Sequence, residues 1–269
     1  MNLSRFRRTP MEKELLQLSR QEMMFREHWV KKQKPGWTAA IESKVPDKLQ
    51  STLDKAFTKA FSVLFEKGIG VIEKTYHKDE LQKTYQVNKF EADLRKDSKS
   101  LRKFSQGAAG TEIANTLMSG VSGMGLGVLG IGLPDILLFT GFMLKGIYET
   151  ALKYGFDYES EDERKFILLL IQGAVSDEEH FNAIDDQVNE YIHGRNFSEE
   201  LTTEVIIQQT ADALSHELLY MKFLQGIPII GVVGGAYDLV YTKRILAYAK
   251  MKYRRRFLRN MEESSHRKG

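Results

Sequence analysis

The chain has 269 residues, contains no cysteine, and carries 39 Lys and Arg against 36 Asp and Glu. This length can bury the core of one large domain or two small ones, and the absence of cysteine excludes disulfides, thiolate metal ligands and cysteine nucleophiles. The N-terminal residues are basic, but no apolar segment follows them, so we predict no signal peptide and a cytoplasmic protein.

The net charge of +3 conceals three blocks of different sign. Residues 1–147 contain 24 Lys/Arg and 16 Asp/Glu, residues 148–217 contain 4 and 17, and residues 218–269 contain 11 and 3. The apolar stretches lie in or beside the two basic blocks, a pattern that suits an anionic membrane surface. Solvated lysine-rich helix faces would give the same pattern.

The first part of the chain divides at Pro46. Residues 1–45, with Trp29 and Trp37, are predicted to form an amphipathic basic arm that docks on the core or on a partner. A helical domain is predicted for residues 46–259, and its first helix has apolar residues at helical spacing, namely Leu49, Leu53, Ala56, Phe57, Ala60, Phe61, Leu64 and Phe65.

A glycine-rich stretch without charge runs from Ile113 to Pro134, and after Asp135 the uncharged sequence continues to Lys145. It is consistent with partial insertion into a bilayer and equally with a buried helical hairpin. For Asp135 we favour an acid in the first helical turn, stabilised by the helix dipole, over a catalytic role.

Further helices are predicted from their capping residues. Ser160 with Glu163 and Ser176 with Glu179 form capping-box patterns, Gly194 can end the second of these helices, and Ser198 begins another. No alternating strand pattern or hairpin turn occurs in the sequence. The predicted fold is all-α, a multi-helix bundle with a central glycine-rich apolar helical hairpin.

Two similar units supply that hairpin. Gly132-Leu133-Pro134 and Gly226-Ile227-Pro228 each precede an apolar helix with small residues, and proline suits the first helical turn while glycine allows close helix packing. The residues assigned to the apolar hairpin are Gly123, Gly125, Gly127, Gly130, Gly132, Pro134, Gly226, Pro228, Gly231, Gly234 and Gly235.

A basic segment follows the second unit. It contains no acidic residue, and apolar residues alternate with its cations, so we predict contact with anionic lipid. Nucleic acid is the rival partner, but no reading motif is present, and residues 260–269 are predicted to be a disordered polar tail. The predicted lipid-contacting residues are Lys243, Arg244, Lys250, Lys252, Arg254, Arg255, Arg256 and Arg259.

The catalytic motifs in the chain are incomplete. Gly125, Gly127 and Gly130 fit G-x-G-x-x-G, but the preceding sequence does not read as a strand. His216-Glu217 would begin a zinc-protease helix, but the second histidine position is Tyr220. We therefore predict no catalytic residue, no cofactor and no metal.

Three segments resemble a known family. GLPDILLFTGFMLKGIYETALKYGF, SEDERKFILLLI and GIPIIGVVGGAYDLVYTKRILAYAKMKYRRRF are similar to the EcsC family of bacterial proteins, over roughly residues 50 to 257. The family is named for a protein encoded beside an ABC transporter, so the resemblance implies a link to transport. It implies no reaction and no catalytic residues.

The leading hypothesis is a non-enzymatic accessory protein, peripherally associated with the inner face of the cell membrane through the apolar hairpin and the basic segment. Its partners would be anionic lipid and ABC transporter subunits. A second hypothesis is a soluble helical domain that binds a lipid or another apolar ligand. The third is a hydrolase with an unrecognised site, for which Asp135 and His216 would be the first residues to test.

Overall fold

The computed structural model describes residues 8–31, 47–105, 134–194, 196–224 and 236–266. Within these residues every regular element is helical and none is a strand, so the predicted all-α class is confirmed. The elements, including two π-helical segments and one 3-10 turn, are α1 (Pro10–Phe25), η2 (Arg26–Val30), α3 (Asp47–Val63), η3 (Leu64–Gly68), α4 (Ile69–Glu73), α5 (Lys78–Arg95), α6 (Ser98–Arg102), η4 (Lys103–Ser105), α8 (Pro134–Lys153), α9 (Glu161–Val175), α10 (Glu178–Ile192), α11 (Thr203–Leu224) and α12 (Ala236–His266).

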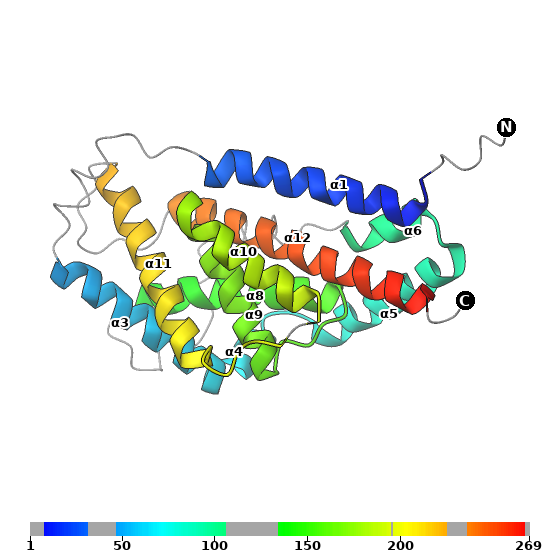
Figure 1. Ribbon diagram of the computed structural model, residues 1–269. Coiled ribbons are helices and arrows are strands. Elements are labelled where there is room, and N and C mark those ends of the chain that lie inside the picture. Colours follow the sequence, from blue (N-terminus) through cyan, green and yellow to red (C-terminus); the bar gives the residue numbers. More distant parts are fainter. Residues whose placement is uncertain (1–7, 32–46, 106–133, 195, 225–235, 267–269) are drawn as a thin grey trace.

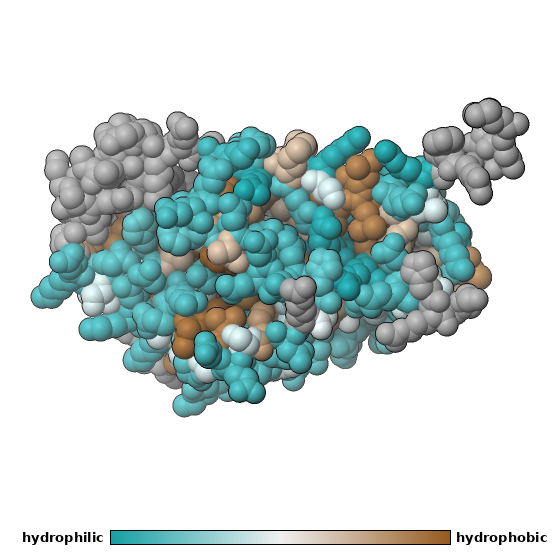
Figure 2. Space-filling model, in the orientation of Figure 1, coloured by the Kyte–Doolittle hydropathy of each residue, from teal (hydrophilic) through white to brown (hydrophobic). Residues whose placement is uncertain are grey.

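The long helix α12 lies at the centre of the arrangement (Figure 1). In the same orientation, hydrophilic residues predominate on the surface, with smaller hydrophobic patches between them (Figure 2). Helix α12 contacts α1, α8, α9 and α10. Helix α11 packs against α3 and α9, and α5 packs against α8. Segments far apart in the sequence, above all α1 and α12, therefore lie side by side.

Most of the predicted apolar stripe after Pro46 is buried, whereas Leu49 and Leu53 at its start are partly exposed. Ala56, Phe57, Ala60 and Phe61 of α3 form part of the core. The helix then continues as the π-helical segment η3, which keeps Leu64 and Phe65 buried as well. The spacing of apolar residues therefore predicted both the helix and the face that it buries.

One of the two predicted capping boxes differs from the structure. Ser160 accepts a hydrogen bond from the Glu163 backbone N–H (3.2 Å), as predicted. Helix α10, however, is capped by Asp177, and the Ser176 hydroxyl instead donates to the Gln172 carbonyl at the end of α9 (2.8 Å). Two adjacent residues could cap α10, and the carboxylate takes the position because a negative charge is favoured at a helix N-terminus.

The end of α10 lies where Gly194 predicted it, whereas α11 begins later than predicted. Gly194, with φ of 77°, follows α10 in the left-handed region that glycine adopts without strain. Helix α11 begins at Thr203, later than predicted from Ser198, and the Thr202 hydroxyl accepts from the Val205 N–H (3.3 Å).

Helices α8 and α12 run in the same direction. Tyr154, which follows α8, contacts Phe104 and Phe257, with ring centroids 6.5 and 5.9 Å apart. Both helices begin about 30 Å back along their axes from this aromatic cluster. Their starts lie at the end of the bundle where α11 finishes (Figure 1). There the Tyr241 hydroxyl donates to the Glu217 carbonyl (3.4 Å).

The glycine-rich hairpin falls largely outside the described residues. Its members in 106–133 and 225–235 are not described, and Pro134 begins α8. The helices that follow the two units, α8 and α12, do pack against each other. Among the described helices, none combines the length and apolar character that spanning a bilayer requires.

The end of α12 differs from the predicted disordered tail. The helix continues to His266, and Arg259 Nε lies 2.7 Å from Glu263 Oε1 one turn later. Ion pairs at this spacing support an exposed helix, whereas the polar composition alone suggested disorder.

Candidate functional site

The candidate site lies along the seam between α1 and α12, which run antiparallel. Glu14 pairs with Arg254 near one end of the seam, Phe25 stacks on Tyr248 (5.3 Å between centroids) further along, and the Arg244 guanidinium lies over Trp29 (6.0 Å) at the other end. A groove lies on each side of the seam. We call them the α10-side groove and the α6-side groove, after the third helix that lines each one.

Helix α1 owes its position to its own sequence. Thr9 and Glu12 form a complete capping box, and Pro10 occupies the first turn. Leu18 and Phe25 lie seven residues apart on one face and are buried against α12. The acids Glu14 and Glu22 lie on or next to this face, so they meet the basic residues of α12.

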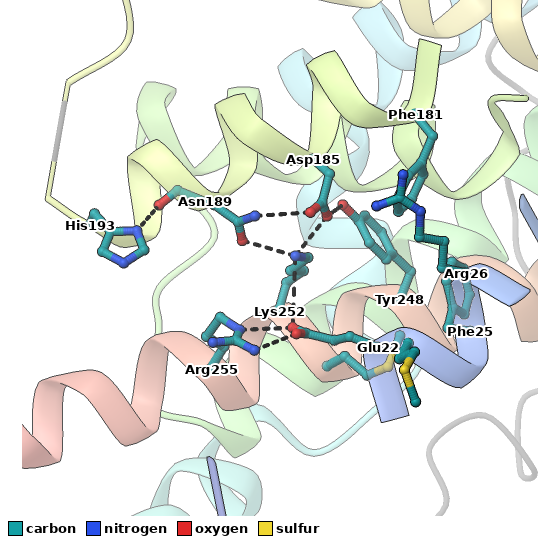
Figure 3. A pocket seen from close by; sticks show the side chains of 12 residues that line it. Glu22, Phe25, Arg26, Phe181, Asp185, Asn189, His193, Tyr248, Lys252 and Arg255 are labelled. Atoms are coloured by element: carbon teal, nitrogen blue, oxygen red, sulfur yellow. Dashed lines mark hydrogen bonds and ion pairs between the residues drawn. The ribbon is translucent and has the colours of Figure 1, made fainter. Parts of the chain in front are cut away.

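The α10-side groove has a volume of about 440 Å³ and is bordered by α1, α10 and α12 (Figure 3). Lys252 lies at its centre. The Lys252 ammonium is 2.7 Å from Asp185 Oδ1, donates to Asn189 Oδ1 (2.9 Å), and lies 3.7 Å from Glu22 Oε1. This single cation thus joins α1 and α10 to α12.

The two acids of this groove have further partners. The Tyr248 hydroxyl donates to Asp185 Oδ1 (2.5 Å), and Arg255 Nε donates to Glu22 Oε1 (2.8 Å). Burial, and next the charge of Asp185, raise the pKa of Tyr248 well above its usual value. The hydrogen bonds to Glu22 raise the pKa of the Arg255 guanidinium. The two acids of the groove are therefore paired with Lys252 and Arg255.

The rim of the α10-side groove is aromatic and amphipathic. Phe181 lies edge-on to Tyr248 (5.6 Å), and Arg26 lies over Phe181 (5.9 Å) while donating to Asn182 Oδ1 (2.5 Å). Arg26 Nε is buried without a hydrogen-bond partner in the described structure. The described lining side chains include no serine, threonine or cysteine, and Asp185 is held by both Tyr248 and Lys252.

A comparison with models of known protein families shows which family the chain belongs to. Residues 11–258 match the model described as the EcsC protein family. The chain belongs to the EcsC family. No curated protein and no solved structure is significantly similar to it. Because the EcsC match begins at residue 11, it includes all of α1 except Pro10, although residues 1–45 were predicted as an arm outside the strongest similarity.

Three of the cations predicted to contact lipid are buried in this EcsC protein. Arg244 donates to the Ser176 carbonyl (3.0 Å) and lies 3.4 Å from Glu217 Oε1, and burial lowers the pKa of its guanidinium. Arg254 lies 2.5 Å from Glu14 Oε2, and Lys252 holds the network described above. In this conformation these side chains face other helices.

The remaining cations of the basic segment vary in exposure. Arg255 pairs with Glu22 and Arg259 with Glu263, whereas Arg256 pairs with Glu163 (2.7 Å) and lies against the rings of Phe156, Tyr191 and Phe166. Lys243 is exposed and Lys250 is partly buried. Lipid contact by the segment stays a prediction, and Lys243 is the residue best placed for it.

The sequence did contain a signal for this pairing. Glu14 and Glu22 stand on or beside the apolar face of α1, and an acid in such a position requires a partner when it is buried. The acidic block 148–217 likewise supplies Glu163, Asp185 and Glu217 to α12. The opposite charges of the last two blocks therefore indicated internal neutralisation as well as a basic surface.

Proposed function

We propose that this EcsC protein is a non-enzymatic accessory protein that associates with the inner face of the cell membrane through its two low-charge stretches. The proposal includes a membrane partner, for which a subunit of an ABC transporter is the candidate implied by the family. The protein would act by holding its helical bundle at the membrane surface.

The observation that carries the proposal is the position of the helix ends. Helix α8 follows the low-charge stretch 113–134, and α12 follows the stretch that contains Ile229, Ile230, Val232 and Val233. Both helices begin at the same end of the bundle (Figure 1). Apolar residues from two distant parts of the sequence are thus attached at one end, where together they could contact a single bilayer.

The ion pairs of α12 indicate whether charge or apolar surface would hold the protein at the membrane. Six of the eight cations of the basic segment have acidic partners within the chain, so less positive charge is available to anionic lipid than the sequence suggested. The proposed association rests mainly on apolar contact, and we expect it to depend only weakly on salt.

Sedimentation with liposomes tests this proposal. Vesicles of phosphatidylcholine, with and without phosphatidylglycerol, are mixed with the protein at about 0.1 M and about 0.5 M NaCl, a range over which the Debye length falls markedly. We expect binding to both compositions with little change between the salt concentrations. Failure to sediment with either composition would sink the proposal, and complete release by salt would assign the contact to charge instead.

Matched variants locate the contact. Leu129→Asp and Ile230→Asp each place a charge in one low-charge stretch, and an acid in a membrane environment costs roughly 2.5 to 3.5 kcal/mol at its most buried, so both should lower the bound fraction. Phe90→Asp is the control, because Phe90 is a highly exposed apolar residue on α5. Equal loss in all three variants would argue against a contact confined to the low-charge stretches.

A further inference from the structure

The α6-side groove lies along the other side of the α1–α12 seam and has a volume of about 500 Å³. Its walls come from α1, η2 and α12, and Arg102 of α6 closes one side. Within the described structure no acidic side chain lines this groove. In this respect it differs from the α10-side groove, where acids and bases alternate.

Positive charge is in excess here. Arg102, Lys250 and Arg254 line the groove, and beneath them lies Glu14, which is fully buried. Glu14 accepts from Arg102 Nε (2.9 Å) and from an Arg254 amino group (2.5 Å). One carboxylate therefore faces two arginines and leaves no charge for Lys250.

Of the three cations of the α6-side groove, Lys250 has the least negative charge near it. Its side chain is partly buried, and it has no ion-pair partner among the residues that the structure describes. Burial, and then the charge of Arg254, lower the pKa of its ammonium group. An anion placed beside Lys250 would supply the missing negative charge in a site that is partly shielded from water.

Polarity changes along the groove. Gln17, Gln21 and Arg254 lie at one end, whereas Met24, Trp29 and Ala247 lie toward the other. Gln17 and Trp29 are about 18 Å apart along the helical axis. The groove thus joins a cationic region to an apolar channel, and the apolar part leads toward the end of the bundle where α12 begins.

We infer that the α6-side groove binds a single-chain anionic amphiphile. The carboxylate or phosphate head lies against Lys250 in the field of Arg102 and Arg254, and the hydrocarbon chain lies along Met24, Met251 and Trp29. The head supplies the charge that Glu14 alone does not, and the chain covers apolar surface that is otherwise exposed to water. This inference stands independently of the membrane contact proposed above.

Calorimetric titration with defined probes tests the inference. Decanoate and decyl phosphate, both kept below their micellar concentrations, are compared with neutral 1-decanol and with acetate and inorganic phosphate, which lack the chain. We expect saturable binding of one or both anionic amphiphiles and at least tenfold weaker binding of the other three probes. The two head groups distinguish a fatty carboxylate from a lipid phosphate. Equal affinity for 1-decanol would overturn the inference.

Two variants and a control identify the site. Lys250→Met should weaken anionic amphiphile binding at least tenfold, and Lys243→Met, which removes an exposed lysine from the same helix, should not. Ala247→Trp fills the apolar half of the groove from an exposed position, and it should also abolish binding. Retention of wild-type affinity in either Lys250→Met or Ala247→Trp would overturn the assignment. A cooperative thermal transition at or above the wild-type melting temperature shows that each variant is folded.

The fluorescence of Trp29 provides a second measurement of binding, at the groove itself. In a Trp37→Phe background, in which Trp29 is the remaining tryptophan, the amphiphile should shift the emission spectrum. A shift that instead follows protein concentration in the absence of amphiphile would assign the groove to a second copy of the chain. Because no vesicle is present in these titrations, their outcome is separate from that of the liposome experiment.

Discussion

The two grooves beside the α1–α12 seam are built from the same pair of helices and differ in how their charges are balanced. On the α10 side, Glu22 and Asp185 face Lys252 and Arg255 within one network. On the α6 side, Glu14 accepts from Arg102 and Arg254, and Lys250 has no acidic partner among the described residues. The comparison separates basic residues that hold helices together from a basic residue that remains available to a ligand.

The largest effect is expected at Glu14, where the two arginines meet. Glu14→Ala leaves Arg254 buried, with a side chain 6% exposed, and without its carboxylate partner. Removal of one member of a buried pair costs about 3 to 5 kcal/mol, because the remaining charge stays desolvated. Urea denaturation followed by circular dichroism should show this loss in the free energy of unfolding.

Arg102→Ala is the matched control for Glu14→Ala. The Arg102 side chain is 51% exposed, although it contacts the same carboxylate. Its removal should cost no more than about 1 kcal/mol, as for exposed pairs. If both substitutions destabilised the protein equally, the assignment of Glu14 as the partner of a buried charge would be wrong.

A smaller loss is expected from Asp185→Ala in the α10-side groove. Of its polar partners among the described residues, Lys252 then keeps Asn189 and the more distant Glu22, and the Tyr248 hydroxyl loses its acceptor. We expect the free energy of unfolding to fall by about 2 to 3 kcal/mol, less than for Glu14→Ala because partners remain. Asp186→Ala, at the exposed neighbouring position, should change stability by about 0.5 kcal/mol or less.

The contrast between the grooves also shows what the sequence could and could not predict. Helical periodicity predicted α3 and its buried face, and the cap at Ser160 was right, because both depend on residues close together in the chain. The partners of the cations were missed because Glu14 and Arg254 are 240 positions apart. A local reading of the basic segment therefore counted as surface charge several groups that are buried in ion pairs.

The two grooves can be compared directly by the same substitution two positions apart. Lys252→Met removes a cation from the paired network and should lower the free energy of unfolding by about 1 to 2 kcal/mol, since Asp185 and Glu22 lose a shared partner. Lys250→Met removes a cation without an acidic partner in the described structure, so stability should be unchanged or rise by up to about 1 kcal/mol. Parallel urea titrations at pH 7 measure both, and a loss of stability in Lys252→Met but not in Lys250→Met is the expected result. Equal destabilisation by the two substitutions would remove the distinction between the grooves.

The smallest expected effect is a pH dependence of the difference in stability between the wild type and Lys250→Met. Since burial and Arg254 lower the pKa of Lys250 below its ordinary 10.5, the folded protein releases this proton at a lower pH than the unfolded chain. Between the two pKa values the unfolded state binds more protons, so the stability of the wild type rises with pH relative to Lys250→Met. Any stability advantage of Lys250→Met at pH 7 should therefore shrink as the pH approaches 10.5, where residue 250 is becoming neutral in both the folded and the unfolded wild type.

Denaturation of both proteins at intervals from pH 7 to pH 10.5 gives the difference in stability, in which the titration of tyrosines common to both proteins cancels. A difference that grows with pH would mean that Lys250 gains a partner on folding, and the α6-side groove would then be balanced like its neighbour.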